Sequence, residues 1–257
     1  MLTQVIDIAK EAGELIKQIY LSNTYKAEHK ADRSLLTIAD TQADDLIVAA
    51  LTHKFDELVI SEETYQSDDL LPPDDEPYWL VDPLDGTKNF VERKDTFAVS
   101  IARMVGGKPT LGVIYAPMFD EMYSAELGRG AFLNGRRISN SRSSEPLIAI
   151  ASGSEVSERG KIFYEKFQVG EVIRIGSAIK FGWLAQGKAD LYPRFGETSE
   201  WDIAAGHIIF AEAGGKIISM ETGLEIKYAK PGLRNHGFLA SRANLNLEIE
   251  MMKLLGH

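Results

Sequence analysis

The most constraining feature of this chain is a short apolar run over residues 78–81 that ends directly in Asp82-Pro83-Leu84-Asp85-Gly86-Thr87. An apolar run of this length with polar or proline-rich flanks is typical of a buried strand. The proline fixes the backbone where the strand ends, so that Asp82 and Asp85 can turn toward one point with the Leu84 carbonyl between them. An Asp-Pro or an Asp-Gly pair alone would indicate an ordinary turn. Both pairs together, after a buried strand and before a threonine, favour a functional site.

The end of this run offers room for an anionic ligand. Gly86 has no side chain, so the backbone there can approach a ligand closely. Its N–H group and those of Thr87 and Lys88 could hold phosphate oxygens, particularly if a helical turn begins at this point. We therefore expect residues 86–88 to contact the phosphate of a substrate.

Three further acids lie where other elements are expected to begin or end: Asp40, Glu62 and Asp202. Carboxylates that converge repel one another, and hard divalent cations are the usual remedy. Mg²⁺ fits best, because no His or Cys cluster indicates zinc. Each acid also has an ordinary interpretation. Asp40 could belong to a capping box, Asp202 could begin a helix, and Glu62 could form a solvated pair with Glu63.

The hydrophobic pattern predicts an α+β fold of layered helices and strands. We expect an amphipathic helix over residues 1–20, a polar loop from Lys26 to Ser34, and a second helix that begins with a capping box at Thr37–Asp40. Alternation from Phe97 to Ala125 predicts antiparallel strands. The second half alternates strands over residues 147–151, 172–175 and 189–192 with helices over 157–167, 177–186 and 202–213, and a last helix runs to residue 255. The polar segment 139–145 predicts two subdomains, residues 1–140 with most of the acids and residues 141–257 with Asp202.

The composition excludes several classes of function. With 28 Lys and Arg against 38 Asp and Glu, the net charge of −10 repels a nucleic-acid polymer. The chain contains no cysteine, which excludes disulfides, thiolate metal sites and thiol nucleophiles. No apolar stretch has the length of a signal peptide core or a membrane span, so we expect a cytoplasmic protein.

Three separate blocks resemble the signature blocks of the inositol monophosphatase superfamily. They are Glu62-Glu63, the run over residues 82–87, and Trp201-Asp202-Ile203-Ala204-Ala205-Gly206. The resemblance covers nearly the whole chain and implies an αβαβα sandwich with the activity of a Mg²⁺-dependent, lithium-sensitive phosphoric monoester hydrolase. It implies that two or three Mg²⁺ ions are bound by Glu62, Asp82, the Leu84 carbonyl, Asp85 and Asp202. It also implies that Asp40, Thr87 and Glu62 take part in activating the attacking water.

Within the superfamily, two segments of the second half resemble most the 3′(2′),5′-bisphosphate nucleotidases: Gly176-Ser177-Ala178-Ile179-Lys180-Phe181 and Leu191-Tyr192-Pro193-Arg194-Phe195-Gly196. A substrate with two phosphates needs cations beyond the metal site, and Lys180 and Arg194 would provide them. The resemblance implies that Gly176, Ser177 and Asp202 also contact the substrate, and that adenosine 3′,5′-bisphosphate is hydrolysed to AMP and phosphate.

Two departures from that pattern leave alternatives open. Asn89-Phe90 is similar to the inositol phosphatases, and Ser152-Gly153-Ser154-Glu155 lacks the Arg and His of the nucleotidases' Ser-Arg-Ser-His block. Inositol 1-phosphate, histidinol phosphate or a range of sugar phosphates are therefore alternative substrates. A non-catalytic sensor of metal or of a phosphorylated ligand is the alternative from another class. Lys180 could be a solvated helix residue, Arg194 a structural ion-pair partner and Ser177 a helix cap. The oligomeric state stays open, with a homodimer as one option.

Overall fold

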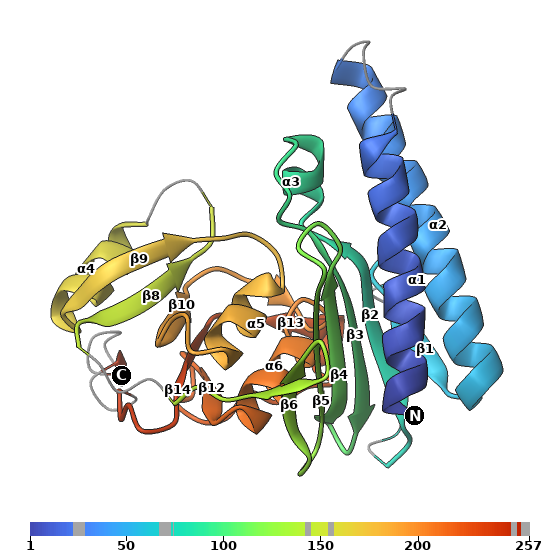
Figure 1. Cartoon of the computed structure of the whole chain (residues 1–257). Helices are drawn as coiled ribbons and strands as arrows, with labels where there is room; N and C mark the ends of the chain where they lie inside the picture. Colours follow the sequence, from blue (N-terminus) through green and yellow to red (C-terminus); the bar gives the residue numbers. More distant parts are fainter. Residues whose placement is uncertain are drawn as a thin grey trace.

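The computed structural model describes residues 1–22, 29–66, 73, 75–141, 145–153, 157–247 and 251–252, and over residues 29–36 it describes the backbone alone. Figure 1 shows helices and strands in five alternating layers. Helices α1 (Leu2–Leu21) and α2 (His29–Phe55) form the first layer, and a seven-stranded sheet forms the second. The layers confirm the α+β sandwich that the sequence predicts.

The strands of the first sheet are arranged in the order in which they occur along the chain. The first pair, β1 with β2, is parallel, and every later pair is antiparallel. The segment from Phe97 to Ala125 forms consecutive antiparallel strands, as its alternation predicts. The strands are β1 (Leu58–Ser61), β2 (Tyr78–Asp85), β3 (Ala98–Val105), β4 (Lys108–Ala116), β5 (Glu121–Glu126), β6 (Gly130–Leu133) and β7 (Arg136–Ile138).

Strand β2 is buried on both of its faces. Trp79 and Val81 pack with the apolar stripes of α1 and α2, whereas Tyr78 and Leu80 belong to the core on the opposite side of the sheet. A strand that is covered on both faces reads as a continuous apolar run, because alternate side chains enter different cores. This double burial places the end of β2, which carries the acids, deep in the molecule.

The second half forms a five-stranded sheet in the order β12-β14-β10-β8-β9. Helices α5 (Ile179–Ala185) and α6 (Ala204–Glu212) form the layer between the two sheets, and α4 (Glu158–Lys166) lies against β9 (Figure 1). The strands are β8 (Leu147–Ala151), β9 (Val169–Arg174), β10 (Leu191–Arg194), β12 (Gly215–Ser219) and β14 (Phe238–Arg242). Short elements complete the chain: α3 (Thr87–Val91), β11 (Thr198–Ser199), the 3₁₀ helix η2 (Pro231–Leu233) and β13 (Arg234–Asn235).

The prediction of a loop to Ser34 and of a helix start at Thr37 is wrong. Helix α2 already begins at His29, so Asp40 lies in the interior of the helix rather than in its first turn. The physical reason is that residues 29–36 contain neither Pro nor Gly and are rich in good helix formers, so nothing stops the helix before the Thr-x-x-Asp pattern. Residues 26–28 of the predicted loop lie outside the described residues.

Other predicted boundaries shift by a few residues. Helix α6 begins at Ala204 rather than Asp202, and α5 begins at Ile179 rather than at residue 177. The division at residues 140 and 141 falls between the two sheets and stays a prediction, with residues 142–144 outside the described part. The last helix is described at residues 251–252, and its predicted end lies beyond them. None of the helices in the described ranges combines the length and hydrophobicity needed to cross a membrane.

Candidate active site

A bulge at the end of β2 brings its two acids to one face of the sheet. Residues three apart in a regular strand point to opposite faces. Here Asp82 lies opposite Ser100 and Asp85 opposite Ala98, so that three steps on β2 match two steps on β3. The extra residue on β2 is a β-bulge, and it places the side chains of both acids on the same face of the sheet. The backbone N–H of Leu84 donates to Asp82 Oδ1 at 3.1 Å and holds this turn.

Two acids from other elements join this face. Glu62 follows β1, and its backbone N–H donates to the Val81 carbonyl at 3.0 Å, so the parallel pair β1 and β2 ends at one place. Asp202 lies in the turn before α6, where its Oδ2 accepts the N–H of Ser199 at 2.8 Å. Carboxylate oxygens of Glu62, Asp82 and Asp202 lie within 4.8 Å of one another. The structure thus brings together three acids that are widely separated in the sequence.

The electrostatics of the cluster favour a cation. Burial raises the pKa of Asp82 well above its ordinary value, and the charges of Asp85 and Glu62 raise it further. Burial and the charge of Asp85 raise the pKa of Asp202 to about 7. The pKa values of Glu62 and Asp85 are also raised, chiefly by burial. A set of crowded carboxylate oxygens with raised pKa values is a donor set that suits a hard divalent ion.

Asp40 reaches the same cluster from helix α2. Burial raises its pKa to about 8, and the neighbouring charges of Glu63 and Glu62 contribute to the shift. Thr87 is the first residue of α3, directly after the turn that carries Asp85. The structure therefore places the two residues of the predicted proton relay on elements that border the acids, and the relay itself stays a prediction.

The backbone at Gly86 packs closely against Thr96 and against Ser177 in the second half of the chain. Gly86 has a φ of +98°, and a Cβ there would lie 2.9 Å from the Thr96 carbonyl oxygen and 3.1 Å from the Ser177 Cβ. Its N–H and that of Ala178 donate to Asp85, and the phosphate contacts predicted for this loop stay a prediction. Ser177 is buried at a φ of +56°, and its Oγ accepts the N–H of Ile179 at 3.3 Å, while the N-cap of α5 is the next residue, Ala178.

Asn89 and Gly176 pack on each other at the edge of this loop. A Cβ on Gly176 would lie 1.8 Å from Asn89 Nδ2, and that amide donates to the Thr96 carbonyl at 2.9 Å. Asn89 thus fastens α3 to the backbone around it. Asn89 therefore has a structural role in this loop.

The predicted cations differ in their placement. Lys180 is half-buried, lies 5.6 Å above the Tyr192 ring, and its charge lowers the pKa values of Asp85 and Asp202. The ammonium group of Lys88 is turned away, because its side chain is 81% exposed and pairs with Glu92 at 3.7 Å. The structure therefore brings Lys180, but not the Lys88 ammonium, to the acids.

Arg194 faces the acids and keeps free hydrogen-bonding capacity. Its charge lowers the pKa of Asp85. Its Nη2 donates to the backbone carbonyl of Glu197 at 3.2 Å, while its Nε, in the described part of the chain, is buried without a hydrogen-bond partner. A structural ion-pair partner would have these donors occupied by a carboxylate. The geometry of Arg194 favours a ligand contact over that interpretation.

A cavity of about 320 Å³ extends from Arg194 to the start of α4. Its walls include Ser152, Arg159, Tyr164, Tyr192 and Arg194. Sequence reasoning missed Arg159, which lies near the altered Ser152–Glu155 block, although residues 154–156 of that region lie outside the described residues. The only local signal was an arginine close to a block that lacks its usual basic residues.

The comparisons with known proteins agree with this geometry. Residues 1–251 match the model of the inositol monophosphatase family. Over 245 residues, 94% of this chain and 99% of the relative, the chain is 38% identical to the 3′(2′),5′-bisphosphate nucleotidase CysQ of Escherichia coli (strain K12). The protein of the same name from Buchnera aphidicola subsp. Acyrthosiphon pisum (strain APS) is 36% identical over 249 residues, 94% of this chain and 93% of the relative.

A solved structure supports the same assignment. CysQ from Bacteroides thetaiotaomicron, a bacterial member of the inositol monophosphatase family, aligns with a TM-score of 0.83 at 34% identity, over 94% of this chain and 96% of that one. The chain belongs to the inositol monophosphatase family, as its three acidic blocks predict.

Proposed function

We propose that this protein is a Mg²⁺-dependent phosphatase that hydrolyses adenosine 3′,5′-bisphosphate to AMP and phosphate. The observation that carries the proposal is the convergence of Glu62, Asp82 and Asp202 within 4.8 Å, next to acids and cations that fit a phosphate ester. The kinship with enzymes named as 3′(2′),5′-bisphosphate nucleotidases supports the choice of substrate.

The residues that would hold Mg²⁺ are Glu62, Asp82, the Leu84 carbonyl, Asp85 and Asp202. Hard carboxylate and carbonyl oxygens are the ligands that this ion prefers. When bound, divalent ions neutralise phosphate oxygens and lower the pKa of water. The number of ions, two or three, is part of the proposal.

The remaining groups of the site would handle the proton and the phosphate. The Thr87 hydroxyl accepts a proton from the attacking water as it passes its own proton to Asp40. Asp40 suits that role because it is a carboxylate beside the acids whose pKa is raised by burial, so it has a greater tendency to accept a proton than an exposed carboxylate. The N–H groups of Thr87 and Lys88 donate to phosphate oxygens. The bond from phosphorus to the 3′-oxygen breaks as the water attacks, and the departing 3′-oxygen takes a proton from a solvent water to become the 3′-hydroxyl of AMP.

The cavity beside Arg194 would hold the rest of a nucleotide. Arg194 lowers the pKa of Asp85 and also lines the cavity, so a ligand there lies next to the acids. Arg159 and Arg194 supply positive charge for a second phosphate, and Tyr164 and Tyr192 supply aromatic surface. Arg159 would thereby compensate for the Arg that the Ser152–Glu155 block lacks.

A substrate panel tests the proposal. Initial rates at equal Mg²⁺ are compared for adenosine 3′,5′-bisphosphate, inositol 1-phosphate and histidinol phosphate. We expect the largest kcat/KM for the nucleotide by at least about tenfold, since loss of one charged hydrogen bond to a second phosphate costs roughly 1.5–3 kcal/mol. Faster hydrolysis of either other ester would replace the nucleotidase assignment. If no ester is hydrolysed, a non-catalytic sensor becomes the better description.

A further inference from the structure

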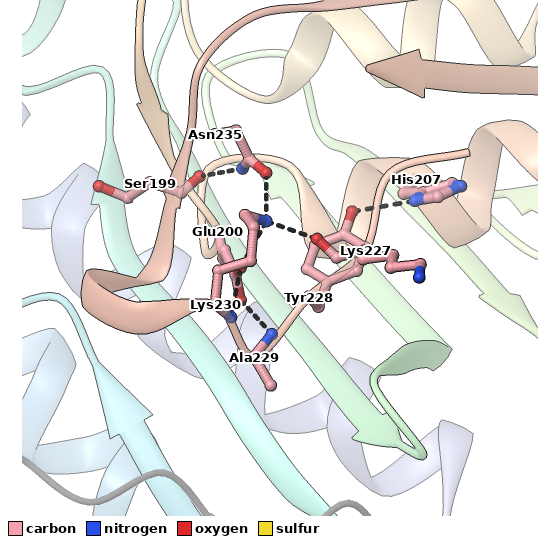
Figure 2. Close-up of polar contacts among 8 residues, drawn as sticks. All are labelled: Ser199, Glu200, His207, Lys227, Tyr228, Ala229, Lys230 and Asn235. Atoms are coloured by element: carbon pink, nitrogen blue, oxygen red, sulfur yellow. Dashed lines mark hydrogen bonds and ion pairs between the residues drawn. The ribbon is translucent and has the colours of Figure 1, made fainter. Parts of the chain in front are cut away.

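An ion pair with a buried carboxylate and a partly exposed ammonium group lies two residues from the proposed metal ligand Asp202. Glu200 has no exposed surface, and a carboxylate in such a place needs partners. The Lys230 Nζ lies 2.7 Å from Glu200 Oε1. The backbone N–H groups of Ala229 and Lys230 donate to the same carboxylate at 2.8 and 3.2 Å. Figure 2 shows that these donors all come from one segment of the chain.

The Lys230 ammonium group is also linked to Ser199, in the turn that leads to Asp202. Lys230 Nζ donates to Asn235 Oδ1 at 2.8 Å and to the Lys227 carbonyl. Asn235 Nδ2 in turn donates to the Ser199 carbonyl at 3.4 Å (Figure 2), and β13, which contains Asn235, pairs with β11, which contains Ser199. Lys230 is thus tied to Glu200 by direct contact and to Ser199 through Asn235.

Ser199 and Glu200 both help to position Asp202. The N–H of Ser199 donates to Asp202 Oδ2 at 2.8 Å. The carbonyl of Glu200 accepts the N–H groups of Ile203 and Ala204 at 3.2 and 2.9 Å, which begins helix α6. Asp202 therefore sits in a turn whose first two residues are held in place by Lys230.

We infer that Lys230 is a positioning residue for the metal centre, because it fixes residues 199 and 200 and thereby the carboxylate of Asp202. The inference rests on the proposed function. Replacement of Lys230 by an apolar side chain leaves Glu200 without its cation and leaves Asn235 Oδ1 without the Lys230 donor. Loss of a partner that orients a metal ligand typically weakens metal binding about 10–100-fold.

Calorimetric titration of Mg²⁺ into the metal-free protein tests the inference. We expect Lys230→Met to bind Mg²⁺ about tenfold more weakly than wild type. Lys230→Arg, which keeps the charge and the donors, should retain most of the affinity. Lys227→Met is the matched control and should bind as wild type does, because the Lys227 side chain is exposed. At saturating Mg²⁺ the kcat and KM of Lys230→Met should return close to the wild-type values.

A double variant separates positioning from stability. Glu200→Leu with Lys230→Met removes the buried carboxylate together with its cation, so the melting temperature should recover relative to Lys230→Met. The turn still lacks its hydrogen bonds to residues 229 and 230, so Mg²⁺ binding should stay weak. Recovery of the affinity together with the melting temperature, or wild-type affinity in Lys230→Met, would overturn the inference alone. A wild-type protein that does not bind Mg²⁺ would overturn the proposed function and the inference with it.

Discussion

The Leu84 amide donates its hydrogen bond to the carboxylate of Asp82, two residues earlier, at 3.1 Å. This bond closes a turn at the point where β2 gains one residue over β3. The turn gives Asp82 and Asp85 a common direction and leaves Thr87 at the start of α3. One local contact thereby organises two of the proposed ligands and the residue proposed to relay the proton.

Replacement of the proposed metal ligand Asp85 or of the proposed relay residue Thr87 should abolish or strongly reduce turnover without unfolding the protein. Asp85→Asn removes a negative charge from a cluster whose members repel one another, so the metal-free variant should be at least as stable as wild type. Thr87→Ala should lower kcat by about 10²–10⁴-fold, the usual effect of losing a proton-transfer group. Initial rates and melting temperatures check both variants. A Thr87→Ala variant with wild-type kcat would remove the hydroxyl from the mechanism.

The stability of the metal-free protein should fall as the pH rises. Asp40 and Asp202 have pKa values raised from 3.8 to about 8 and about 7 in the folded protein. The folded state then binds more protons than the unfolded chain, so the stabilisation is complete below about pH 4 and is lost as the pH approaches 7 to 8. Melting temperatures between pH 5 and 8, with a chelator present, measure this slope.

Mg²⁺ should reverse that trend, because it replaces the protons on the carboxylates. An ion at a hundredfold excess over its Kd stabilises by about 2.7 kcal/mol, which for a chain of this size raises the melting temperature by roughly 5–10 °C. The increase should be larger at pH 8 than at pH 5. Equal increases at both pH values would show that the ion binds away from these acids.

Arg159 should favour the binding of a substrate with two phosphates over one with a single phosphate. Arg159→Gln is expected to raise KM for adenosine 3′,5′-bisphosphate about three- to tenfold, the value of a partly exposed charged contact. KM for adenosine 3′-phosphate, which lacks the second phosphate, should change little. Lys161→Gln is the control, because Lys161 lies on the same helix but pairs with Glu158 at 2.6 Å. An equal effect on both substrates would place the second phosphate elsewhere.

Gly86→Ala should impair the site more than the fold. The Cβ would lie 2.9 Å from the Thr96 carbonyl oxygen, and the φ of +98° is one that L residues rarely adopt. The turn must shift, which moves Asp85 and Thr87 together. We expect kcat/KM to fall by at least about tenfold, with a loss of stability of about 1–3 kcal/mol, the usual cost of backbone strain. Activity measured beside a melting curve distinguishes this outcome from simple unfolding.

Much of the fold follows from local patterns in the sequence. The buried strand before Asp82, the amphipathic first helix and the alternation after Phe97 are all readable, because periodicity reports which faces are covered. The start of α2 is not readable, since the Thr37–Asp40 pattern has the composition of a cap while the helix continues through it. Only the tertiary structure decides whether such a pattern begins a helix.

The candidate site is predictable where its residues share a motif and unpredictable where contacts are distant. The motif with Pro83 predicts that Asp82 and Asp85 turn toward one point, and the bulge that brings them to the same face appears only in the strand register. The pair of Glu200 with Lys230 joins residues thirty positions apart in a chain with 38 acidic and 28 basic side chains. No local pattern selects that pair.

The most direct measurement identifies the products formed from adenosine 3′,5′-bisphosphate, with Mg²⁺ and with a chelator. Chromatography and phosphorus NMR resolve AMP from adenosine 3′-phosphate. The account predicts AMP and inorganic phosphate in equal amounts with Mg²⁺, and neither product with the chelator. Release of adenosine 3′-phosphate, or hydrolysis that proceeds unchanged without a divalent ion, would contradict it.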